Sequence, residues 1–174
     1  MRPILHHALL LAVLPALAFA HDGPHECGTA DAAILGDALT IPVEVPTLLY
    51  FGFTTCPDVC PLDLSRNAEA VEAARAHGVE ARNLFVSVDG ADGPEDVEAY
   101  ALGWPGTEGR VADPALEAAL RVVASPREGA PELIDHSTLT YVAAPGVGVV
   151  ALAARAWEPA RVTDLLICLG PTEP

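Results

Sequence analysis

The stretch Leu-Leu-Tyr-Phe-Gly-Phe-Thr-Thr-Cys-Pro-Asp-Val-Cys-Pro, residues 48–61, decides the fold that we expect. Its apolar run from Leu48 to Phe53 is rich in aromatic residues and too short for a free helix, which predicts a strand buried on both faces. The run leads directly into Cys56 and Cys60, so both thiols should lie at the carboxyl end of a central strand. Pro61 predicts a helix that begins between or just after the cysteines, because proline is favoured in the first turn.

The predicted position of these thiols bears on their chemistry. The amide groups and the positive dipole end at a helix N-terminus stabilise a thiolate over a thiol. We therefore expect a lowered pKa for Cys56 and Cys60, which would make them nucleophiles and soft metal ligands.

The remaining chain alternates predicted helices and strands. Apolar spacing predicts helices over residues 62–78, 95–102, 114–124 and 159–169, and strands over residues 83–88, 139–144 and 149–154. Residues 127–135 are expected to form a polar connection that delivers His136 to the next strand, and residues 145–148 a hairpin turn. Two strand–helix–strand steps followed by a hairpin and a helix predict an α/β, thioredoxin-like fold with a central mixed β-sheet flanked by helices.

Composition limits the classes of partner. A chain of 174 residues with 51% apolar content suits one domain with a proper core. The formal net charge of −15 comes from 24 acidic residues against nine basic ones. Such a surface repels nucleic acid and anionic lipid, so no nucleic-acid partner is expected. It suits a cation or a basic protein surface, and simple solubility is the alternative interpretation.

The amino end predicts export. Residues 1–20 contain Arg2, an apolar stretch over residues 8–20 and a final Ala-Phe-Ala, which is the pattern of a cleaved signal peptide. The apolar stretch is shorter than the roughly 20 residues that span a bilayer. We therefore expect a periplasmic protein beginning at His21, with no transmembrane span in the mature chain. An uncleaved N-terminal membrane anchor is the alternative.

Two segments far apart in the sequence resemble one protein family. Residues 50–61, Tyr-Phe-Gly-Phe-Thr-Thr-Cys-Pro-Asp-Val-Cys-Pro, resemble the signature of the Sco/SenC family, thioredoxin-fold copper chaperones that serve assembly of cytochrome c oxidase. Residues 134–138, Ile-Asp-His-Ser-Thr, resemble the segment that holds the family's copper-binding histidine. Three residues separate the cysteines, whereas a thioredoxin site has two, which argues against an ordinary thioredoxin.

The resemblance is good over residues 48–144 and fades at both ends, which indicates a divergent member. Residues 21–46 look like an N-terminal extension with an abridged hairpin, and residues 47–170 like the thioredoxin-like copper-binding domain. The loop 89–94 is one residue shorter than in the family and lacks its arginine. Asp89 and Asp92 in this loop are candidates for shaping the rim of the site, or are helix caps.

The resemblance implies that Cys56, Cys60 and His136 bind copper. Two thiolates and an imidazole favour Cu(I) over hard ions such as Mg²⁺, and the family resemblance allows Cu(II) as well. Three ligands leave the ion open to stepwise transfer. The acceptor that the family implies is the binuclear copper centre of an oxidase, such as cytochrome c oxidase subunit II. Asp135 is a candidate for orienting the His136 imidazole, and Asp58 for modulating the sulfurs.

Cys56 and Cys60 also permit an enzyme-class alternative. A periplasmic thiol–disulfide oxidoreductase would use the pair to reduce acceptor cysteines and would itself need a thioredoxin-like reductant. His136 discriminates between the two functions, since a metal carrier requires it and a dithiol reductase does not. A permanent structural disulfide between the two cysteines is a third interpretation.

The remaining cysteines and three histidines each have a structural and a functional interpretation. Cys27 and Cys168 lie near the two ends of an exported chain, where a disulfide joining them is expected and free, metal-binding or intermolecular thiols are alternatives. His21 and His25 could chelate a second metal ion, or simply belong to a flexible terminus. His77 is expected to interact with a helix dipole rather than a metal.

Overall fold

The computed structural model describes Cys27, Leu39, residues 41–153 and residues 158–170. The signal peptide expected at residues 1–20 and the candidate chelators His21 and His25 lie outside the described residues. So does most of the segment 21–46, in which an abridged hairpin was expected. In the part that is described, no helix combines the length and apolar character needed to cross a membrane.

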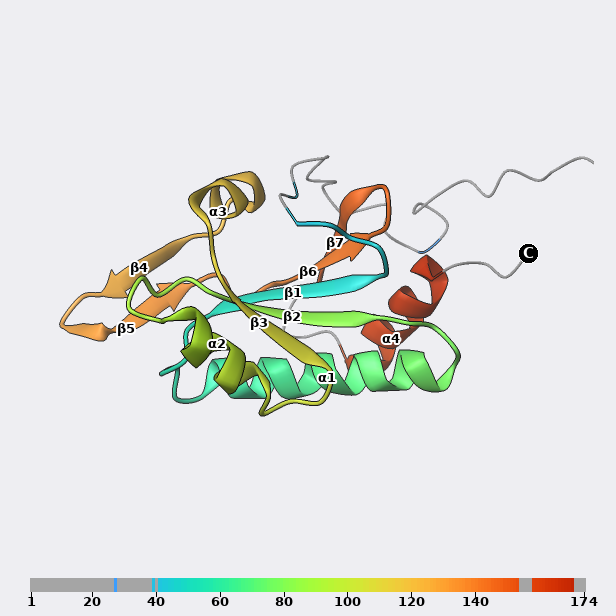
Figure 1. Cartoon of the computed structure of the whole chain (residues 1–174), viewed down its shortest axis with the longest axis horizontal. Coiled ribbons are helices and arrows are strands. Elements are labelled where there is room, and N and C mark those ends of the chain that lie inside the picture. The colour runs from blue at the N-terminus through green and yellow to red at the C-terminus, as the bar shows by residue number, and fades with distance from the viewer. Residues whose placement is uncertain (1–26, 28–38, 40, 154–157, 171–174) are drawn as a thin grey trace, which may run out of the picture.

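The central strand is the one that the apolar run predicted. β1 (Thr47–Gly52) is buried along its whole length. It pairs in parallel with β2 (Arg82–Ser87) and antiparallel with β6 (Thr140–Ala144). β3 (Thr107–Val111) and β7 (Gly148–Ala153) complete a five-stranded sheet of order β3-β2-β1-β6-β7. The prediction of a central mixed sheet flanked by helices is therefore confirmed (Figure 1).

Helices cover both faces of this sheet. α1 (Val59–Ala76), α2 (Pro94–Ala101) and α4 (Pro159–Leu169) lie on one face, and α3 (Pro114–Leu120) lies on the other (Figure 1). Side chains alternate along β1, so Leu48 and Tyr50 pack under α1 whereas Leu49 and Phe51 pack on the α3 side. β1 ends at Gly52 and α1 begins at Val59, so the carboxyl end of the strand lies close to the amino end of the helix.

Two local predictions were wrong, and one strand was missed. Residues 127–135 form part of a two-stranded hairpin, β4 (Ala124–Arg127) and β5 (Ala130–His136), instead of a polar connection. β3 was missed, because an edge strand of sequence Thr-Glu-Gly-Arg-Val lacks an apolar run. α3 ends at Leu120 instead of Ala124, because Arg121 adopts a left-handed conformation with φ of 51°.

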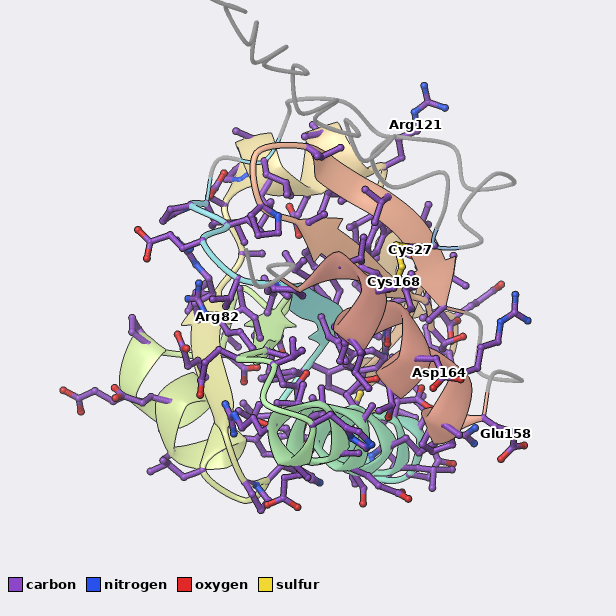
Figure 2. All side chains as sticks on the ribbon, turned by 90° about the vertical axis from the view of Figure 1, so that its right-hand side faces the viewer. Cys27, Arg82, Arg121, Glu158, Asp164 and Cys168 are labelled. Atoms are coloured by element: carbon purple, nitrogen blue, oxygen red, sulfur yellow. A yellow bond between two sulfur atoms is a disulfide. The ribbon has the colours of Figure 1, made fainter. Side chains whose placement is uncertain are left out.

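A disulfide joins Cys27 to Cys168, with 5.7 Å between their Cα atoms (Figure 2). Cys168 lies in the last turn of α4, and Cys27 packs against the apolar cluster that α1, α4 and the sheet form. The bridge closes a span of 141 residues. It lies in a different cluster from Cys56 and Cys60.

Candidate metal centre

Three segments bring two sulfurs and an imidazole together. Cys56 lies in the loop after β1, Cys60 in the first turn of α1, and His136 is the last residue of β5. One ligand atom from each lies within 4.8 Å of the other two. Within the described residues, this is the one group of three or more His, Cys, Asp or Glu side chains with such spacing.

The backbone fixes the two cysteines in one compact loop. The Cys56 amide donates to the Phe53 carbonyl at 3.2 Å, and the Cys60 amide donates to Cys56 Sγ at 3.4 Å. A β-carbon on Gly52 would lie 2.8 Å from Cys60 Sγ. The strand therefore needs glycine at this point so that the sulfur can lie against its backbone.

The two thiols differ in exposure. Cys60 is completely buried and Cys56 keeps 6% of its surface exposed. Burial, followed by the neighbouring Cys56, raises the pKa of the Cys60 thiol. The expected lowering of the pKa is wrong for Cys60, because loss of solvent outweighs the hydrogen bond with the Phe53 backbone that lowers it. Cys60 is therefore a protonated thiol at neutral pH in the metal-free protein.

His136 is held with one nitrogen toward the sulfurs. Its Nδ1 lies 3.0 Å from the Ser137 carbonyl oxygen, which can only accept, so Nδ1 carries the proton and donates it. The lone pair of Nε2 is then free, and Nε2 lies 3.6 Å from Cys60 Sγ. The rings of Phe53 and Tyr50 pack edge-on against the imidazole, with centroids at 5.8 Å and 6.2 Å.

Ser137 was missed as the residue that orients the histidine. The sequence suggested Asp135, but that carboxylate is exposed and forms an ion pair with Arg127 across the hairpin at 2.7 Å. Ser137 is itself fixed at the base of the hairpin, since its amide donates to the Val123 carbonyl at 3.1 Å. A backbone acceptor leaves no sequence signal, so this role could be found only in the structure.

The two acidic loop residues have different roles. Asp92 accepts hydrogen bonds from the Thr54 amide at 2.9 Å, from the Thr54 hydroxyl at 2.6 Å and from the Ser87 hydroxyl. It thereby fastens the loop before α2 to the loop that contains Cys56. Asp89 instead accepts from the Ala91 amide within its own turn. Neither carboxylate caps α2, whose N-cap is Gly93.

A pocket of about 180 Å³ opens beside the three ligands. Cys56 and His136 line it, whereas Cys60 does not. Asp58, an exposed residue at the start of α1, and Arg127 contribute its charged rim, and Arg127 was missed by sequence reasoning. Asp135 and Asp58 raise the pKa of the Arg127 guanidinium, which stays charged. The donor set is therefore reachable through Cys56 and His136.

Comparison with known proteins identifies the family. The SCO1/SenC family model matches residues 43–168, a range that contains all three candidate ligands. The chain belongs to the SCO1/SenC family. Protein SenC of Rhodobacter capsulatus is 36% identical to this SCO1/SenC protein over 136 residues, which cover 72% of the chain and 61% of SenC. The chain thus spans less than two thirds of that relative's length.

Solved structures give the same relationship. Arabidopsis thaliana ScoI with copper bound is 30% identical, with a TM-score of 0.65, over 71% of this chain and 82% of that one. Bradyrhizobium japonicum ScoI with copper bound is 29% identical, with a TM-score of 0.62, over 72% and 85%. The predictions of Sco/SenC membership and of a thioredoxin-like fold for this SCO1/SenC protein are confirmed.

Proposed function

We propose that this protein is a copper carrier that binds one copper ion through Cys56, Cys60 and His136 and transfers it to an acceptor protein. The observation that carries the proposal is the convergence of two Sγ atoms and one imidazole nitrogen within 4.8 Å. Two sulfur donors and one imidazole form a soft set that suits Cu(I) and disfavours hard cations. The two solved relatives whose structures contain bound copper support the choice of metal.

The residues present fit the ion. The Ser137 carbonyl holds the His136 tautomer whose Nε2 lone pair is available for a metal. Three protein ligands leave a coordination position open, which a carrier needs for stepwise exchange. Because Cys56 and His136 line the pocket, an acceptor's ligand can approach the ion between them.

The acceptor and the compartment are parts of this proposal. The family resemblance implies delivery to a binuclear copper centre, such as that of cytochrome c oxidase subunit II. The hydrophobic amino end supports export to the periplasm by a cleaved signal peptide. The strongly acidic composition suits a basic face on the acceptor.

Anaerobic Cu(I) titration of the reduced protein tests the proposal. We expect one tightly bound ion that protects two thiols from a thiol reagent. His136→Ala should weaken binding by at least about tenfold, since it removes one of three ligands. His77→Ala is the matched control, because His77 is exposed and its Nδ1 contacts only the Ala73 carbonyl among the hydrogen bonds of the described residues. Copper affinity unchanged by His136→Ala would refute the site.

A second candidate function is thiol–disulfide exchange. Both thiols are free, and Cys56 lines the pocket while Cys60 lies behind it. Cys56 would attack a substrate disulfide, and Cys60 would resolve the mixed disulfide, so that two protein thiols become one disulfide and the substrate gains two thiols. A thioredoxin-like reductant would return the two electrons. If the wild type reduces a disulfide substrate but binds no copper stoichiometrically, this function replaces the carrier.

A further inference from the structure

Among the described residues, the buried hydroxyl group of Tyr50 forms no hydrogen bond. Tyr50 belongs to β1, and none of its side chain is exposed. Its Oη is inaccessible to solvent and unsatisfied. An unpaired buried hydroxyl is costly, and native proteins rarely keep one without a role. Phenylalanine would fill the same space without that cost.

The Tyr50 ring lies next to two of the candidate metal ligands, His136 and Cys60. Its ring packs edge-on against the His136 imidazole at 6.2 Å. A β-carbon on Gly52 would meet Cys60 Sγ at 2.8 Å and Tyr50 Cε1 at 3.3 Å, so the sulfur and the phenol ring border the same small space. Tyr50 and Cys60 also share one buried apolar cluster.

The phenol can act only as a donor in this position. A phenol keeps its proton at neutral pH, so the Tyr50 hydroxyl can donate a hydrogen bond. The Cys60 thiol and the Asp63 carboxylate are the ionisable groups that act on it. A protonated Cys60 thiol is a weak acceptor, whereas a metal-bound thiolate is a strong one.

We propose that Tyr50 is a positioning residue for copper, whose hydroxyl donates a hydrogen bond to Cys60 Sγ once that sulfur is a copper-bound thiolate. This inference rests on the proposed function. The hydroxyl, which forms no hydrogen bond with the described residues of the metal-free protein, gains a strong acceptor when copper binds. The two cysteines then have different roles. Cys60 is the ligand that the Tyr50 hydroxyl stabilises, and Cys56, which lines the pocket, is the ligand that exchanges first.

The test compares Tyr50→Phe with Tyr141→Phe. Both changes remove one buried hydroxyl, but Tyr141 Oη donates to the Leu120 carbonyl at 3.0 Å and packs on the other face of the sheet. Tyr50→Phe should weaken Cu(I) binding by about 10- to 100-fold in competition with a chromophoric chelator, as loss of a partner of a metal ligand does. It should also shift the sulfur-to-Cu(II) charge-transfer band to longer wavelength.

Without metal, the Tyr141→Phe variant should be the less stable of the two, although Tyr50→Phe is the variant that binds copper more weakly. Tyr50→Phe should unfold at the same temperature as the wild type or higher, because it removes an unsatisfied group, whereas Tyr141→Phe should unfold lower and bind copper normally. This pattern separates positioning from a general effect on folding. A Tyr50→Phe variant with wild-type affinity and an unshifted band would overturn the inference while leaving the carrier intact. Failure of the wild type to bind copper would overturn both.

Discussion

Replacing Gly52 by alanine should disturb the metal centre through a single methyl group. The new β-carbon would lie 2.8 Å from Cys60 Sγ and 3.1 Å from Phe85 Cε2. Non-bonded heavy atoms prefer separations of about 3.5–4.0 Å, so the methyl group overlaps the sulfur by about 1 Å. Cys60 and Phe85 are completely buried, so neither can move into solvent. Such overpacking costs about 1–3 kcal/mol of the free energy of unfolding.

Two measurements check the effect of Gly52→Ala. Thermal unfolding should show a midpoint lowered by about 2–12 °C, the range expected for that loss in a domain of this size. Copper affinity should fall by about tenfold or more, because the Cys60 sulfur is displaced from His136. Gly90→Ala is the control: a β-carbon there meets no heavy atom within 4 Å, so stability should change by less than about 0.5 kcal/mol. If Gly52→Ala melts and binds copper like the wild type, the close packing of Cys60 on the strand is wrong.

Two further predictions concern the cysteines. In the reduced, metal-free protein, the thiol of Cys60 stays protonated after the unfolded chain ionises near its ordinary pKa of 9.0, so stability should fall as pH rises above 9.0, by up to about 1.4 kcal/mol per pH unit. Urea unfolding at a series of pH values should show this slope, and Cys60→Ser should reduce it; an equal slope in both proteins would contradict the burial argument. Cys27→Ser should cost about 2–5 kcal/mol, because the bridge to Cys168 closes a span of 141 residues, yet leave copper affinity unchanged. A large loss of copper affinity in that variant would show that the bridge supports the site as well as the fold.

The sequence predicted those parts of the structure that depend on continuous apolar patterns. The run from Leu48 to Phe53 predicted the central strand because every residue of β1 is buried, and a strand buried on both faces reads as a nearly continuous apolar run. The same reasoning located α4 at Pro159–Leu169. The candidate ligands were located by motif, because sulfur and imidazole in a fixed spacing report chemistry directly.

The sequence could not predict features that depend on solvent exposure or on backbone atoms. β4 is exposed along its length, so its residues carry no apolar alternation that would indicate a strand. Asp135 seemed a natural partner for the adjacent His136, yet neighbouring residues of a strand point to opposite faces, and Asp135 instead pairs with Arg127. The raised pKa of Cys60 depends on packing by residues distant in sequence, which no local pattern reports.

The unequal environments of the three ligands give the proposed transfer a direction. Cys60 is completely buried, and its Sγ lies 3.6 Å from Nε2 of His136. Cys56 instead lines the pocket. Removing copper from Cys60 first would leave a thiolate buried without an ion, which is costly in a medium of low polarity. Ligand exchange that begins at Cys56 avoids this cost, because an incoming ligand and solvent can reach that sulfur while Cys60 still neutralises the ion. Cys56→Ser should therefore alter the rate of copper release to a chelator more than Cys60→Ser does, measured for both variants at equal initial copper loading. Equal release rates would show that burial does not set the order of exchange.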